Sequence, residues 1–220
     1  MIPKIIHYCW FGGKPKPKLV QRCMASWATY APGFALREWN ERNFDVNALP
    51  FTRDAALAGN YAFVSDVARA KALYVQGGVY LDTDTELLRP LDALLGEKLF
   101  AGFEAGGFIG TALLGSEPGH PIWAAYLAQY ENEQFAAYKG TNVQLLTTLL
   151  EARGLARADS HQQLPDVRIY PSDWFSPYDY RSAKLHLSEN SMAIHHFSGS
   201  WFPWHVRVRP QIKKVLRKFI

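Results

Sequence analysis

The stretch Gly77–Glu86, GGVYLDTDTE, constrains the fold of this chain more than any other. Its two glycines end a helical pattern, and the short apolar run Val79–Leu81 predicts a buried strand. Asp82 and Asp84 follow at the end of that strand, where the two-residue period of extended backbone places both carboxylates on one side. Like charges so close repel each other, and a divalent cation with oxygen ligands, Mg²⁺ or Mn²⁺, is the simplest species that relieves the repulsion. The alternative interpretation is a polar turn after the strand.

The helical pattern before this strand adds two charged candidates. From residue 53 to residue 76, apolar side chains recur at three- and four-residue steps, which predicts a helix that leads directly into the acidic pair. Asp66 and Arg69 lie one turn apart on it. They form either an ion pair that stabilises the helix by a few tenths of a kcal/mol, or two functional side chains beside a metal.

Strand and helix patterns alternate through the first half of the chain. The segment 4–11 predicts a first strand that ends at Gly12 and Gly13, and 35–39 predicts a second strand after an amphipathic helix. Alternation of this kind up to about Gly119 predicts an α/β fold, with a mainly parallel sheet and helices on both faces.

Two segments near the C-terminus carry further candidates. The loop 171–180 is rich in aromatic residues, which either pack in the core or cover the face of a sugar ring. The segment 193–197 predicts a last strand with two histidines followed by a glycine turn. A histidine there is either structural or a third ligand for Mn²⁺, because neutral imidazole binds that ion.

The composition bounds the class of protein. A chain of 220 residues with 48% hydrophobic residues forms one domain, or one domain with a small appendage. The two cysteines make no disulfide framework, which favours a reducing compartment. Neither a signal peptide nor an apolar run of membrane-spanning length is recognisable, so we expect a cytoplasmic protein.

Positive charge is concentrated at the C-terminus. The last sixteen residues hold six of the 24 Lys and Arg residues and no acid, and without them 18 bases face 20 acids. The body is therefore not basic, and we expect no nucleic acid partner. We divide the chain into a main domain, 1–204, and a basic amphipathic tail, 205–220. The tail fits either a helix on an anionic lipid surface or a helix docked on the protein.

Four stretches taken together resemble glycosyltransferase family 32. They are Ile2–Gly13, Phe63–Arg69, Gly77–Asp84 and Ile194–Trp201, in this order. That family includes bacterial capsular-polysaccharide transferases and yeast-type mannosyltransferases. The resemblance runs nearly end to end and implies a GT-A fold, with residues 1–204 as the catalytic domain. In that fold a Rossmann-like sheet carries a metal-dependent nucleotide-sugar site at the carboxyl ends of its strands, where open α/β sheets bind ligands.

The resemblance also implies roles for individual residues. The catalytic residues would be Asp66, Arg69, Asp82 and Asp84. Asp82, Asp84 and His196 would hold Mn²⁺ or Mg²⁺, because the departing diphosphate needs a cation. The nucleotide-sugar-binding residues would be His7, Trp10, Ser65, Asp66, Arg69, Tyr80, Asp82 and Trp201.

The expected activity is that of a metal-dependent retaining hexosyltransferase. It would move a sugar from a nucleotide sugar, a UDP-sugar, to an oligosaccharide or lipid-linked acceptor in the synthesis of surface polysaccharide such as a capsule. Acceptor contacts would lie between Gly106 and Gly140, where the resemblance is weakest, and Glu104 is a candidate by position. The tail would add a peripheral contact with the inner face of the membrane.

Two other functions stay open on the sequence alone. One is a phosphohydrolase of the haloacid-dehalogenase type, which also carries Asp-x-Asp at a strand end but prefers Thr or Val where this chain has Glu86. The other is a carbohydrate-binding protein without turnover. Release of UDP from a UDP-sugar separates the first expectation from both alternatives.

Overall fold

The computed structural model describes residues 1–138 and 140–198. The strands are β1 (Ile5–Cys9), β2 (Ala35–Trp39), β3 (Gly78–Leu81), β4 (Thr85–Leu87), β5 (Leu99–Glu104), β6 (Phe108–Ile109), β7 (Leu113–Ser116), β8 (Gln162–Gln163), β9 (Arg168–Tyr170), β10 (Tyr178–Asp179), β11 (Lys184–Leu185) and β12 (Ala193–His195). The α-helices are α1 (Lys18–Tyr30), α2 (Pro50–Leu57), α3 (Tyr61–Gln76), α4 (Pro121–Glu131), α5 (Asn142–Glu151) and α6 (Ser172–Phe175), and Asp92–Leu94 and Phe135–Ala137 form 3-10 turns.

The central sheet has the strand order β2-β1-β3-β7-β5-β9-β8, and β6 pairs with β5. β2, β1 and β3 are parallel, and β9 is parallel to β5. β7 runs against both β3 and β5, so those two strands point the same way. Among the described strands of this sheet, only β6, β7 and β8 oppose the common direction. The predicted α/β fold with a mainly parallel sheet is therefore confirmed, and β7 is its antiparallel insertion.

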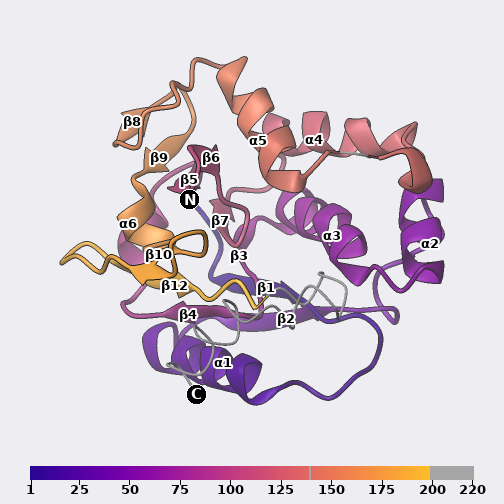
Figure 1. Cartoon of the computed structure of the whole chain (residues 1–220), viewed down its shortest axis with the longest axis horizontal. Helices are drawn as coiled ribbons and strands as arrows, with labels where there is room; N and C mark the ends of the chain where they lie inside the picture. Colours follow the sequence, from indigo (N-terminus) through magenta and orange to yellow (C-terminus); the bar gives the residue numbers. More distant parts are fainter. Residues whose placement is uncertain (139, 199–220) are drawn as a thin grey trace.

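Helices cover both faces of the sheet, as Figure 1 shows. α2, α3, α4 and α5 lie together on one side, and their buried faces form one hydrophobic cluster with the sheet, around Phe51, Leu73 and Trp123. α1 lies on the other side, where Trp27 is fully buried and packs against Tyr8. Two buried layers of this kind give the sheet a rigid frame.

Two glycines fix the passage from α3 into β3. Gly77 and Gly78 have φ values of +62° and +106°, which side chains rarely tolerate. A Cβ atom at Gly78 would also lie only 2.7 Å from the carbonyl oxygen of Ile5 on β1. Glycine is therefore required here, and it holds β3 directly beside β1. As a result, the residues after β3 leave the sheet at the edge formed by the carboxyl ends of β1, β3 and β5, which we call the carboxyl edge.

Several local expectations need correction. Asp82, Thr83 and Asp84 do not continue the strand but form a turn between β3 and β4, closed by a hydrogen bond from the Thr85 N–H to the Asp82 carbonyl. The single helix expected from residue 53 to residue 76 is two helices, because the chain turns at residues 58–60. The tail, 205–220, and the boundary before it lie outside the described residues. None of the helices in the described part of the chain combines the length and apolarity needed to cross a bilayer.

Candidate functional site

Two carboxylates and one imidazole meet at the carboxyl edge of the sheet. Asp82 and Asp84 come from the β3–β4 turn, and His195 comes from the end of β12. One ligand atom from each of the three side chains lies within 4.8 Å of the other two. β12 reaches this position because it pairs antiparallel with β4, with His195 opposite Thr85. β4, which directly follows the acidic pair, therefore also positions His195 beside that pair.

The charges of this triad depend on one another. Burial alone would raise the pKa of Asp84, but His195 and the hydrogen bonds from Ser198 outweigh burial and hold that pKa well below its usual range. The backbone N–H of Ser198 donates to Asp84 Oδ2 at 2.7 Å. Burial disfavours the imidazolium of His195, yet Asp84, followed by Asp82 and Glu104, raises its pKa. The carboxylates of this site thus stabilise a positive charge placed between them.

The donor set fits a hard divalent cation. Two carboxylates and an imidazole are ligands that Mn²⁺ accepts, and Mg²⁺ favours the carboxylates. In addition, Nδ1 of His195 is buried and has no hydrogen-bond partner among the described residues. A protonated His195 and a divalent ion balance the same carboxylate charge, so the two compete for this position.

The histidine in this cluster is not the one expected from the sequence. His196 was predicted as the ligand, but its Nε2 atom lies 2.7 Å from Glu86 Oε2 instead. Neighbouring residues of an extended segment point to opposite sides, so only one of the two histidines can face the acidic pair. The sequence did not reveal which one, because that depends on the register of β12 against β4.

Arg69 joins the helix α3 to this edge. Its guanidinium Nη2 lies 3.2 Å from Asp66 Oδ1 and 3.2 Å from Asp82 Oδ1, and Nη1 donates to the Thr111 carbonyl at 2.8 Å. The i,i+3 ion pair is therefore confirmed, and the same guanidinium contacts Asp82 of the triad. A buried guanidinium between two carboxylates keeps its charge, and those carboxylates, with Tyr80, hold its pKa above the usual value against the effect of burial.

Tyr80 and Asn142 orient the two acids. Tyr80 is 1% exposed, and its hydroxyl donates to Asp82 Oδ1 at 3.0 Å. Asn142, in the first turn of α5, donates through Nδ2 to Asp66 Oδ1 at 2.7 Å and to Thr111 Oγ1 at 2.9 Å. Burial raises the pKa of Asp66 to about 7, with Arg69 and Asn142 opposing the rise and Asp82 adding to it. Asn142 was missed by sequence reasoning, since no local motif separates it from an ordinary residue of a helix start.

Two other residues expected to bind the nucleotide sugar, His7 and Ser65, use their polar atoms in contacts within the fold. His7 is fully buried in β1, where its Nε2 pairs with the Gly77 carbonyl and its Nδ1 accepts from the Trp39 indole. Both ring nitrogens are thus used inside the core, and the expected binding role of His7 is not supported. The Ser65 hydroxyl donates a hydrogen bond to the Tyr61 carbonyl.

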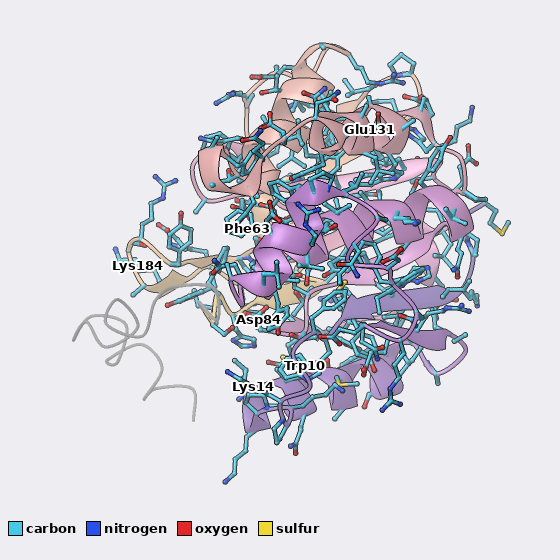
Figure 2. The ribbon with its side chains drawn as sticks, turned by 90° about the vertical axis from the view of Figure 1, so that its right-hand side faces the viewer. Trp10, Lys14, Phe63, Asp84, Glu131 and Lys184 are labelled. Atoms are coloured by element: carbon cyan, nitrogen blue, oxygen red, sulfur yellow. The ribbon has the colours of Figure 1, made fainter. Side chains whose placement is uncertain are left out.

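Trp10 and Trp201 complete the expected set. Trp10 follows β1 and is partly exposed, and in the view of Figure 2 Asp84 lies between Trp10 and Phe63 of α3. Lys16 Nζ lies 5.6 Å from the centre of the Trp10 ring. Trp201 lies outside the described residues.

Glu104 ends β5 at the same edge. Burial raises its pKa, His195 and Arg69 lower it, and Asp82 raises it further. These influences place its carboxyl group within the same electrostatic site. The position of Glu104 at the end of a strand, suggested by the sequence, is confirmed.

Comparisons with known proteins agree with this geometry. Residues 17–101 match the family model described as "Glycosyltransferase sugar-binding region containing DXD motif", a range that includes Asp82 and Asp84. Over 124 residues the chain is 26% identical to the human (Homo sapiens) "Alpha-1,4-N-acetylglucosaminyltransferase", a match that covers 53% of this chain. The chain spans 34% of the length of that relative.

Solved structures share the fold. "PaToxG Glycosyltransferase" gives a TM-score of 0.53 at 15% identity, covering 69% of each chain. The apo form of the glycosyltransferase GlyE of Streptococcus pneumoniae TIGR4 gives 0.52 at 13% identity, covering 99% of this chain and 63% of that one. The fold is that of GT-A glycosyltransferases. In sequence, the two matched stretches are similar to glycosyltransferases.

Proposed function

We propose that this chain is a metal-dependent glycosyltransferase that uses a nucleotide sugar. The observation that carries the proposal is that Asp82, Asp84 and His195 lie together at the carboxyl edge. The guanidinium of Arg69 contacts Asp82 at the same place. Open α/β sheets bind nucleotides at this edge, and a leaving diphosphate needs concentrated positive charge. The match to a DXD-containing sugar-binding region supports the same conclusion.

The residues of the site have separate roles in metal binding and in the orientation of the metal ligands. Asp82, Asp84 and His195 would hold Mn²⁺ or Mg²⁺, which supplies positive charge to the diphosphate when bound. Tyr80 and Arg69 fix the orientation of Asp82 through hydrogen bonds to its Oδ1 atom. In the reaction, an acceptor hydroxyl oxygen forms a bond to the anomeric carbon and gives its proton to solvent or to the phosphate. The bond from that carbon to the diphosphate breaks, and the electron pair leaves with the nucleotide.

For the donor we propose a UDP-hexose or a UDP-N-acetylhexosamine, transferred with retention. The similar human protein is named for α-1,4 transfer of N-acetylglucosamine, which supports an α-linked product. Asp66 would accept hydrogen bonds from hydroxyls of the donor sugar, because no described residue donates to its Oδ2 atom while Asn142 and Arg69 hold Oδ1. Trp10 would stack on the base. Its partly exposed ring follows β1, which is the neighbour of β3 in the sheet.

The biological setting is an extension of the same proposal. We propose an oligosaccharide or lipid-linked acceptor in the synthesis of surface polysaccharide, with the protein in the cytoplasm and its basic tail, 205–220, against the inner face of the membrane. The tail's charge supports this setting, since six bases and no acid fall in those sixteen residues.

The test is a screen of UDP- and GDP-sugars with Mn²⁺, reading the released nucleotide by chromatography. We expect release from one UDP-sugar by the wild type and loss of release in Asp84→Asn. Asp92→Asn, which removes an exposed carboxylate paired with Lys4, is the matched control and should retain release. Turnover of p-nitrophenyl phosphate with no release from any nucleotide sugar would instead favour the phosphohydrolase alternative.

A further inference from the structure

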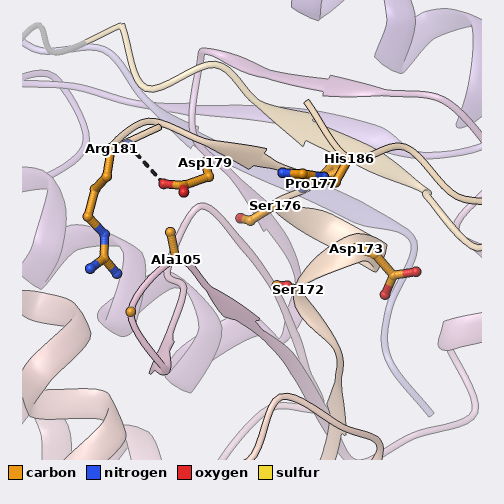
Figure 3. Close-up of a pocket in the computed structure, with 9 residues that line it drawn as sticks. Ala105, Ser172, Asp173, Ser176, Pro177, Asp179, Arg181 and His186 are labelled. Atoms are coloured by element: carbon orange, nitrogen blue, oxygen red, sulfur yellow. Dashed lines mark hydrogen bonds between the residues drawn. The ribbon is translucent and has the colours of Figure 1, made fainter. Parts of the chain in front are cut away.

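A polar pocket lies next to the site just described. Its cavity volume is about 410 Å³, within the range of small-molecule sites. One wall is the turn that follows β5, at Ala105 and Gly106, and the other is formed by α6 and the β10–β11 hairpin. In Figure 3, Arg181 runs down one side of the pocket near Ala105, and Asp173 stands on the opposite side.

Two connections tie this pocket to the metal-binding triad. The first is Glu104, which directly precedes the pocket wall and whose pKa responds to the charges of both His195 and Arg181. The second is aromatic: the Phe197 ring lies 3.8 Å from the His195 ring and 4.7 Å from the Tyr180 ring, centroid to centroid. The pocket and the triad therefore share the carboxyl edge, with no other element of the described fold needed to connect them.

The lining of the pocket offers hydrogen-bond donors and acceptors together. Asp173 and Asp179 supply carboxylates, Ser172 and Ser176 hydroxyls, and Arg181 and His186 nitrogen atoms. Asp179 is already oriented, because its oxygens accept from the Arg181 backbone N–H at 2.8 Å and from Ser182 Oγ at 2.7 Å. Arg181 brings a guanidinium with five N–H donors to the same lining.

Asp179 and Arg181 are two residues apart and both line the pocket, whereas Tyr180 between them is not a lining residue and its ring packs on Phe197. A pyranose ring presents hydroxyls at its edge, and these can reach the carboxylate and the guanidinium together.

We propose that this pocket is the acceptor subsite and that it takes an uncharged sugar residue. The hydroxyls of that sugar bond to Asp179 and Arg181. This proposal rests on the proposed function, because an acceptor sugar is a substrate of a glycosyltransferase. The lining carries two carboxylates against one guanidinium, and this negative balance disfavours an acidic sugar.

Binding of simple glycosides tests the proposal without requiring turnover. Saturation-transfer NMR is recorded with methyl glucoside, methyl galactoside, methyl mannoside and methyl N-acetylglucosaminide, with methyl glucuronide as the charged comparison. We expect the wild type to bind at least one of the uncharged glycosides, and to bind it more tightly than the glucuronide. Arg181→Ala and Asp179→Ala should each weaken that binding about tenfold, as expected for loss of one charge-assisted hydrogen bond.

The controls make each outcome decisive. Arg53→Ala removes an exposed guanidinium of α2, outside the pocket, and should bind like the wild type. Circular dichroism checks that each variant is folded. Binding to none of the uncharged glycosides, or unchanged binding in both pocket variants, would overturn the proposal. Failure of the proposed function has a different signature, in which the glycoside binds through Asp179 and Arg181 but no nucleotide is released from any nucleotide sugar.

Discussion

Asp66→Asn should change how the stability of this protein depends on pH. Asp66 is buried in α3, and burial raises the pKa of its carboxyl group from 3.8 to about 7. A carboxyl group with a raised pKa in the folded state binds its proton more tightly there than in the unfolded chain. The contribution of this group to the stability of the wild type is therefore fully present below the unfolded pKa, and it is lost as the pH rises towards 7.

The size of the effect follows from the same values. At about 1.36 kcal/mol per pH unit, the loss from pH 3.8 to about pH 7 totals roughly 4 kcal/mol, of which roughly 3 kcal/mol falls between about pH 5 and pH 8. The asparagine variant has no proton to release at this position. The free energy of unfolding of Asp66→Asn minus that of the wild type should thus increase by about 3 kcal/mol over that interval.

The assay is denaturant unfolding followed by circular dichroism, in the presence of a chelator so that metal binding does not contribute. Asp54→Asn, which removes an exposed carboxylate on α2, controls for the loss of one negative charge. A stability difference between Asp66→Asn and the wild type that stays constant from acid to alkaline pH would refute the reasoning. It would mean that Arg69 and Asn142 fully compensate the burial of this carboxylate.

Three further predictions concern single residues. Gly78→Ala should lower the free energy of unfolding by about 3 kcal/mol, because its φ of +106° is strained for a side chain and its Cβ would strike the β1 backbone, whereas Gly59→Ala, at a φ of +69° with open space around it, should cost about 1 kcal/mol by thermal unfolding. Tyr80→Phe removes a hydrogen bond to Asp82, and should slow nucleotide release about tenfold with a stability loss of about 1 kcal/mol; an unchanged rate would contradict it. Asn142→Ala removes the donor to a buried carboxylate of α3, and should raise the KM for the nucleotide sugar about tenfold in steady-state kinetics; an unaltered KM would count against that role.

The sequence was informative where local periodicity determines geometry. Asp66 and Arg69 are three residues apart on a helix, so their contact followed from spacing, and the glycines after that helix predicted its end. The approach of Asp82 to Asp84 was also expected, but for the wrong reason. The expectation assumed an extended strand, whereas a hydrogen-bonded turn brings them together.

What the sequence did not reveal depends on contacts between distant segments. The choice of His195 over His196 is set by how β12 pairs with β4, more than a hundred residues earlier in the chain. His7 matched a family pattern, yet its side chain bonds inside the core to Trp39. Asn142 reaches the site because the start of α5 lies beside Asp66 of α3, and no local sequence pattern predicts this contact between the two helices.

The most direct test of the account is Mn²⁺ binding, followed through the electron paramagnetic resonance signal of the free ion. Wild type and His196→Ala should bind Mn²⁺ alike, because the imidazole of His196 is paired with Glu86. His195→Ala should weaken binding at least about tenfold, since it removes the only imidazole of the triad formed by the described residues. Undiminished Mn²⁺ binding by His195→Ala, or loss of binding in His196→Ala alone, would contradict the central claim.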